Sequence, residues 1–147
     1  MTSFSNEEGV NAVTLSIDEF GAIIQLVYQG FEFSDDRLSE IGLSFPVVSA
    51  MRGFAREARR LVGGGATRVL VVVDREMAEG APPIFDVMEE SGTLAIHISK
   101  SFGIFWLRLI DLALGGSSRR ELLLRTGYEH GDLARAANLL MAIPELR

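Results

Sequence analysis

The pattern of hydrophobic and polar positions along the chain predicts five strands. Residues 69–73 are all aliphatic and mostly β-branched, which is typical of a strand covered on both faces, and we expect this strand to span 67–73. Residues 93–99 alternate, so that Leu94, Ile96 and Ile98 share one face of a second strand. Three shorter β-rich runs complete the expected strands: 13–17, 22–29 and 121–125. The segment 18–21 is expected to join the first two of these as a hairpin loop.

Helical spacing of apolar residues predicts helices between these strands. The clearest helix begins near Pro46, which is tolerated in a first helical turn, and ends at the glycines 63–65. Residues 101–114 are also predicted as a helix, although their aromatic residues would suit a strand as well, so the sequence leaves this choice open. The other expected helices are 35–41, 84–90 with Gly92 as its terminator, and 133–142 with Asp132 as its cap.

The order of the main elements is therefore β-β-α-β-α-β-α-β-α. Strands that alternate with helices predict an α/β fold, in which a mostly parallel or mixed sheet carries helices packed on it. We expect a single domain over residues 12–147. Small and polar residues dominate the stretch before it, so a flexible N-terminal tail is expected over residues 1–11.

Composition and charge narrow the class of protein. Of the 147 residues, 48% are hydrophobic and none is cysteine, so the chain can bury a core without disulfides. The first residues carry neither a basic run nor an apolar core, and we therefore expect no secretory signal and a cytoplasmic location. The longest apolar stretch, 102–114, contains Arg108 and Asp111 and is too short for a membrane span. A net charge of −6 disfavours binding to nucleic acid.

Three segments of the chain carry a resemblance to a known fold. They are residues 21–27 followed by Gly30, the strand-like run 68–74, and the terminal helix 132–140. In pattern and topology, residues 12–143 resemble the sulfate-transporter and anti-sigma-antagonist (STAS) fold, including its SpoIIAA-like relatives. The resemblance implies a domain that acts by binding partners. Anti-sigma antagonists carry a phosphorylatable Ser or Thr after the central strand, whereas residues 74–80 contain neither, so the resemblance implies that this switch is missing.

The stretch 102–114 is the most informative part of the sequence for function. A helix that covers one face of a sheet needs a single apolar stripe, and this one is apolar nearly all round. Burial within the domain, a homodimer contact, a different protein partner and an apolar ligand would each account for the excess. The residues expected at such an interface or ligand site are Phe102, Phe105, Trp106, Leu109 and Ile110.

Two residues are candidates for a polar site. Asp74 follows the buried strand, where open α/β sheets place their ligands, and a loop residue that hydrogen-bonds the next turn is the alternative. His97 is a candidate general base, or else a hydrogen-bonded histidine under a helix. His130 and Asp132 are too few to form a metal site, and no metal or cofactor is expected. The glycines 63–65 follow a helix instead of preceding one, so they do not form a phosphate loop.

A row of arginines lies on the helix that begins near Pro46. They form a basic ridge on an acidic protein, suited to an acidic partner or a membrane surface, or simply a solvated helix face: Arg52, Arg56, Arg59 and Arg60.

Four functional hypotheses follow from these patterns. The first is a non-enzymatic protein-interaction or regulatory module of STAS-like type, which binds a protein partner or a second copy of itself as a homodimer. The second is a carrier of a small apolar ligand or lipid. The third is a small acidic antagonist or immunity-type protein, whose charge speeds its encounter with a basic target. The fourth is an enzyme built around Asp74 and His97.

Overall fold

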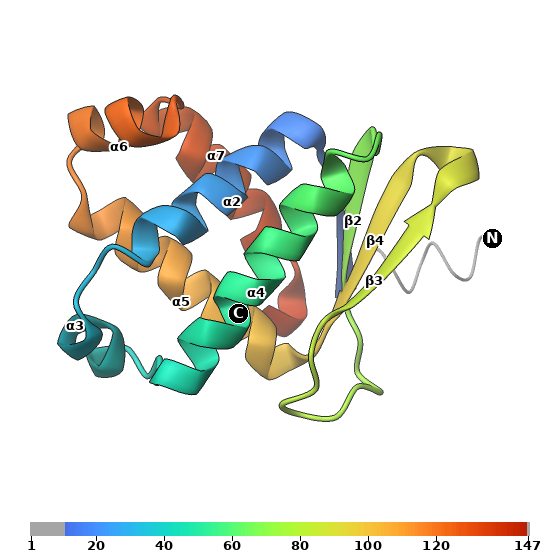
Figure 1. Ribbon diagram of the computed structural model, residues 1–147, viewed down its shortest axis with the longest axis horizontal. Helices are drawn as coiled ribbons and strands as arrows, with labels where there is room; N and C mark the ends of the chain where they lie inside the picture. The colour runs from blue at the N-terminus through green and yellow to red at the C-terminus, as the bar shows by residue number, and fades with distance from the viewer. Residues whose placement is uncertain (1–10, 147) are drawn as a thin grey trace.

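The computed structural model of the protein describes residues 11–146 and shows an α/β domain with a mixed four-stranded sheet (Figure 1). The strands are β1 (Ala12–Ser16), β2 (Arg68–Val73), β3 (Ile84–Met88) and β4 (Thr93–Ile98), and their order in the sheet is β1-β2-β4-β3. The central pair β2 and β4 is parallel, and both edge strands pair antiparallel. The predicted fold class is confirmed. The tail expected over residues 1–11 lies, apart from Asn11, outside the described residues.

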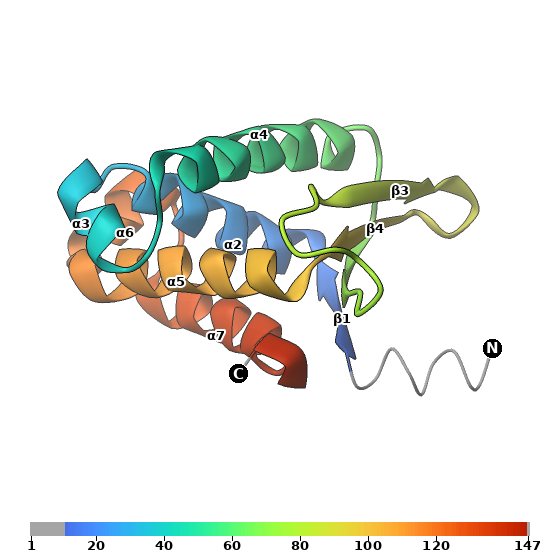
Figure 2. The ribbon, with the colours of Figure 1, turned by 90° about the horizontal axis from the view of Figure 1, so that it is seen from below.

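The long helices all lie on one side of the sheet (Figures 1 and 2). The helices are α2 (Ile17–Gly30), α3 (Asp35–Glu40), α4 (Phe45–Val62), α5 (Lys100–Gly116), α6 (Arg119–Thr126) and α7 (His130–Met141). Helix α2 is central, because it contacts α4, α5, α6 and α7 as well as β1 and β2. The register of the sheet aligns Leu15, Val69 and Leu94, which are fully buried. Within residues 11–146, no helix has both the length and the apolar character needed to cross a membrane.

The segment 22–29, predicted as a strand, is instead the centre of helix α2, so the opening hairpin is wrong. Ser16 ends β1 and caps α2, since its hydroxyl accepts the Glu19 amide at 3.1 Å while the Glu19 carboxylate accepts the Ser16 amide at 2.7 Å. The apolar residues of α2 lie on nearly all of its faces, because other helices pack around it. A buried helix of this kind lacks the polar face that makes helical spacing visible in a sequence.

Two further elements differ from the prediction. Residues 84–88 form strand β3 instead of a helix, and a short 3₁₀ turn, Glu89–Ser91, joins β3 to β4. The antiparallel pairing with β4 satisfies the backbone groups of this segment and overrides its local helical pattern.

Residues 121–125, predicted as a strand, belong to helix α6, which Ser118 caps by accepting the Glu121 amide at 3.0 Å. The final helix begins at His130 with Glu129 as its cap, so Asp132 lies inside the first turn.

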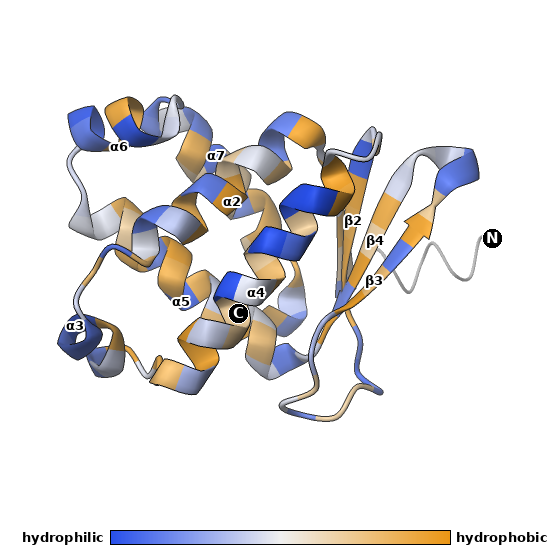
Figure 3. Cartoon of the chain, viewed as in Figure 1, coloured by the Kyte–Doolittle hydropathy of each residue, from blue (hydrophilic) through white to orange (hydrophobic). Residues whose placement is uncertain are grey.

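The remaining predicted elements are confirmed. They are the strands near 13–17, 67–73 and 93–99 and the helices near 35–41, 46–62 and 101–114. Of the segments that carry the STAS resemblance, 68–73 form a strand and 132–140 lie in a helix, whereas 21–27 are helical. Figure 3 shows hydrophobic residues concentrated along the sheet and between the helices, while α4 turns hydrophilic residues outward. The core therefore lies between the sheet and the helical layer.

Candidate functional site

The apolar residues of α5 are mostly buried inside the domain. Trp106, Leu109 and Ile110 each have an exposed fraction of 0%, so they belong to the core of this chain and offer no surface to a partner. Leu109 packs against α2 at the position of Gly30. Of the five residues predicted for an interface or ligand site, Phe102 and Phe105, near the start of α5, line an open surface.

That surface is an apolar groove between α4, the start of α5, β3 and the loop that precedes β3. We call it the apolar groove; its volume is about 470 Å³. The ribbon views show these elements meeting where the helical layer adjoins the sheet (Figures 1 and 2). Four phenylalanines from three elements form its walls: Phe54, Phe85, Phe102 and Phe105. Pro82 and Pro83 close the side nearest the loop.

Ring contacts hold the aromatic wall in place. The ring of Phe54 stacks on Phe85 with centroids 5.7 Å apart, and it meets Phe102 edge-on at 5.0 Å. Behind this wall, Trp106 also meets Phe54 edge-on at 5.0 Å. Contacts of this geometry favour a fixed arrangement of the rings beyond simple burial. The groove therefore has a rigid aromatic side.

One end of the groove is polar. The hydroxyls of Ser99 and Ser101 lie 3.3 Å apart and line it, and Ser99, which is 1% exposed, accepts the amide of Phe102 at 3.2 Å. Along the α4 wall, Gly53 faces open space, because a Cβ added there would meet no atom within 4 Å. The groove thus combines aromatic walls with one small group of hydroxyls.

Asp74 and His97, predicted from different strands, do lie together. The Nδ1 atom of His97 and the Oδ2 atom of Asp74 are 4.0 Å apart, and both side chains are about one-third exposed, at 33% and 35%. Parallel pairing causes this, since Val72 is aligned with His97 and Asp74 follows two residues later on the same face. The other carboxylate oxygen of Asp74 accepts the Glu76 amide at 2.9 Å, so Asp74 also shapes the start of the loop.

The pair lacks the third group that acid–base or nucleophilic chemistry requires. Within residues 11–146, no hydroxyl and no second carboxylate forms a hydrogen bond or ion pair with His97. A nucleophile must lie within hydrogen-bond reach of its base, or be connected to it through one water. The geometry therefore supplies a histidine beside a carboxylate at 4.0 Å and no further reacting group among the described residues.

Among the described residues, one of the four arginines of α4 forms an ion pair and the other three do not. Arg60 forms an ion pair with Glu57 at 2.6 Å, and this hydrogen bond lowers the pKa of the Glu57 carboxyl below its usual value. Arg59 lies over the ring of Tyr28, 5.4 Å from its centroid. Arg52 and Arg56 have no carboxylate within ion-pair distance among the described residues. They line a second, polar pocket between α2 and α4.

The His130–Asp132 pair has no metal-binding partners in the described part of the chain. Asp132 forms an ion pair with Arg135, one turn further along α7. Across residues 11–146, no group of three or more potential metal-binding side chains comes together. Comparisons of the chain with protein-family models, with curated proteins and with solved structures found no match.

Sequence reasoning found part of the apolar groove and missed the rest. Phe102 and Phe105 were predicted to face a partner or ligand, but the opposite wall, Phe54 and Phe85, was not. Phe54 has the spacing of an ordinary core residue on α4, and Phe85 lies in the segment predicted as a helix. The proline pair 82–83, just before Phe85, was the available signal. Each proline fixes its own φ angle and so restricts the backbone of the loop that leads to Phe85.

Proposed function

We propose that this protein is a non-enzymatic carrier that holds a small, largely apolar molecule in the apolar groove. The observation that carries the proposal is the groove itself, with about 470 Å³ between aromatic walls and hydroxyls at one end. Small-molecule sites usually have volumes of roughly 300–1,000 Å³, mostly apolar linings and a few polar groups that orient the ligand. The Ser99 and Ser101 hydroxyls would bind the single polar group of such a ligand.

The burial of α5 favours a carrier over a protein-interaction module that uses residues 102–114. That module was motivated by a surplus of apolar surface on this helix. Trp106, Leu109 and Ile110 contribute to the core, which accounts for most of the surplus. The apolar area left over is concave and lies around Phe102 and Phe105. A concave apolar surface suits a small ligand better than a flat protein interface.

Native mass spectrometry of gently purified protein tests this proposal. The wild type is expected to carry additional mass of a few hundred daltons, on the scale of a drug-sized ligand. The Gly53→Leu variant is the matched control, because its side chain would project into open space within the groove. It is expected to be purified without that mass. Wild-type protein that is repeatedly purified without extra mass, or equal extra mass in both proteins, would argue against a ligand in the groove.

Self-association through the edge of the sheet is a second candidate function. Strand β3 lies at one end of the strand order, and it carries three exposed apolar side chains: Ile84 at 56%, Val87 at 51% and Met88 at 43%. An unprotected apolar edge strand invites pairing with another strand. A homodimer formed in this way would extend the sheet across two copies of the chain.

Light scattering after size-exclusion chromatography distinguishes this second candidate. A dimer in the wild type that becomes a monomer in Val87→Lys would support pairing at β3, since a charged residue on an edge strand disfavours it. Leu124→Lys is a suitable control, because Leu124 is 73% exposed and lies on α6. A wild-type monomer, or a dimer that survives Val87→Lys, rejects this interface.

A further inference from the structure

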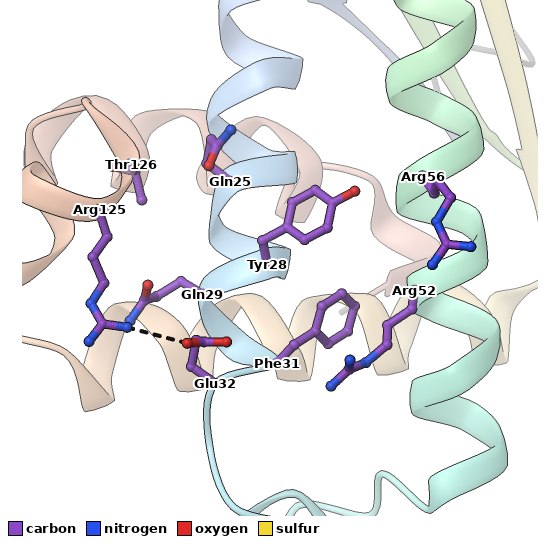
Figure 4. A pocket seen from close by; sticks show the side chains of 9 residues that line it. All are labelled: Gln25, Tyr28, Gln29, Phe31, Glu32, Arg52, Arg56, Arg125 and Thr126. Atoms are coloured by element: carbon purple, nitrogen blue, oxygen red, sulfur yellow. Dashed lines mark ion pairs between the residues drawn. The ribbon is translucent and has the colours of Figure 1, made fainter.

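A second pocket lies between α2, α4 and α6, away from the apolar groove. We call it the arginine pocket; its volume is about 350 Å³ (Figure 4). Arg52 and Arg56 enter it from α4, and Arg125 enters it from α6. The rings of Tyr28 and Phe31 lie between these two sides, as Figure 4 shows. Three separate segments of the chain therefore bring cationic groups to one cavity with an aromatic wall.

The charge of the arginine pocket is opposite to that of the protein as a whole. Its lining contains three arginines and one carboxylate, Glu32, in a chain whose net charge is −6. Arg125 is neutralised in part, because it lies 3.5 Å from Glu32 and 3.6 Å from Glu121. No described carboxylate pairs with Arg52 or Arg56. The α4 side of the pocket thus holds two uncompensated positive charges.

The aromatic wall orients one of these charges. The guanidinium carbon of Arg52 lies 4.9 Å from the centroid of the Phe31 ring. Stacking on a ring leaves the edge of the guanidinium free, and that edge is the part that donates paired hydrogen bonds to an oxyanion. Arg56 follows one helical turn later on the same side of α4 (Figure 4). Arg52 extends toward Phe31 and Arg56 stays beside α4, so both guanidinium groups lie on the α4 side of the pocket and either can donate to an oxyanion.

A nearly buried amide adds a polar contact to the wall. Gln29 is 6% exposed, and its Nε2 donates to the hydroxyl of Ser117 at 3.4 Å. In residues 11–146 nothing donates a hydrogen bond to its amide oxygen, which leaves an acceptor for a ligand hydroxyl or amine. Thr126 lines the same pocket. The pocket thus offers cations, ring faces and a neutral acceptor within one small volume.

We propose that the arginine pocket binds a phosphorylated small molecule, with its phosphate on the α4 side, where Arg52 and Arg56 lie, and its body against Tyr28 and Phe31. A phosphate monoester carries a charge of about −1.5 to −2 at neutral pH and three acceptor oxygens, which matches two guanidinium groups better than a single carboxylate does. The proposal is independent of the ligand of the apolar groove.

Calorimetric titration of the protein with phenyl phosphate at low ionic strength tests this site. Phenyl phosphate provides the phosphate and the ring, and inorganic phosphate provides the phosphate alone. The wild type is expected to bind phenyl phosphate more tightly than inorganic phosphate. Because hydrogen bonds to a charged group contribute strongly, Arg52→Gln and Arg56→Gln are each expected to weaken binding by about tenfold or more. Arg60→Gln removes the same charge from α4 outside the pocket and is expected to change affinity less than about twofold.

Three results would overturn the proposal: a wild type that binds neither probe, binding that survives in the Arg52→Gln and Arg56→Gln double variant, and equal weakening in all three single variants. The last of these would show only the general effect of charge. Among the described residues, Arg56 forms no hydrogen bond, ion pair or ring contact, so Arg56→Gln is not expected to unfold the protein. Far-UV circular dichroism of each variant verifies this directly.

Discussion

Trp106 combines complete burial with an unused hydrogen-bond donor. Its side chain is 0% exposed, and its indole Nε1–H has no acceptor among residues 11–146. An unpaired buried donor costs free energy, while the large ring contributes packing against Phe54 and Phe102. These two effects act in opposite directions on the stability of the domain.

Substitution of Trp106 separates the two effects. Trp106→Ala leaves a large cavity and is expected to lower the free energy of unfolding by about 3–5 kcal/mol. Trp106→Phe keeps an aromatic ring and removes the unpaired N–H, so its loss is expected to be less than half as large. Urea unfolding followed by circular dichroism measures both values. Equal losses in the two variants would contradict this account, because they would mean that the ring retained in Trp106→Phe contributes no packing.

Two helical glycines are expected to respond in opposite directions to the same substitution. An added Cβ at Gly30 would lie 2.5 Å from the Cδ1 atom of Leu109, so Gly30→Ala forces α2 and α5 apart and is expected to cost about 1–3 kcal/mol. At Gly53 the added Cβ meets nothing, and Gly53→Ala is expected to stabilise α4 by up to about 1 kcal/mol. Thermal unfolding of both variants tests this difference, and a shift of equal sign would contradict it.

At the scale of elements, capping determines where β1 ends and α2 begins. The side chain of Ser16 accepts the Glu19 amide, whereas Ser44, the cap residue of α4, makes no such hydrogen bond. Ser16→Ala is therefore expected to lower the free energy of unfolding by about 1 kcal/mol, and Ser44→Ala by clearly less. Denaturant unfolding of the two variants provides the comparison. A larger loss in Ser44→Ala would mean that side-chain capping does not fix this boundary.

The elements that the sequence predicts most clearly are α4, which has a polar side, and β2, which is buried in a parallel position. Helix α4 has an outer face of arginines, and β2 is a continuous aliphatic run, so both are evident from the residues alone. Helix α2 is enclosed by other helices, and its run Ile23, Ile24 and Val27 has the composition of a strand. The sequence did contain a local signal for the start of α2, because Ser16 and Glu19 have the spacing of a capping box.

At the scale of the whole molecule, the long helices pack together on one side of the sheet. This packing explains why the sequence predicted only part of the site. Most of the apolar surplus on α5 is buried against α2 and α7, and Trp106 also meets Phe54 of α4; no local sequence pattern reveals these contacts. The apolar groove forms where the start of α5, α4 and β3 meet, and its walls come from residues far apart in the chain, such as Phe54 and Phe105, which are 51 positions apart. Asp74 was identified because it follows a buried strand, and His97 because it lies on the face of strand 93–99 opposite Ile96 and Ile98; the parallel pairing brings the two together.

The most direct test of the account is a titration of the protein with the neutral fluorophore N-phenyl-1-naphthylamine. The chain contains one tryptophan, Trp106, which contacts the aromatic wall of the apolar groove at Phe54. Energy transfer from Trp106 to the fluorophore therefore reports binding near the groove. Three proteins are compared: the wild type, Gly53→Ala and Gly53→Leu.

We expect saturable energy transfer in the wild type and in Gly53→Ala, and a loss of binding of at least about tenfold in Gly53→Leu, whose side chain fills space that the ligand needs. Variants that are at least as stable as the wild type in urea exclude a general loss of folding as the cause. Saturable binding that is unchanged in Gly53→Leu, or the absence of binding to the wild type, would contradict a carrier function for the apolar groove.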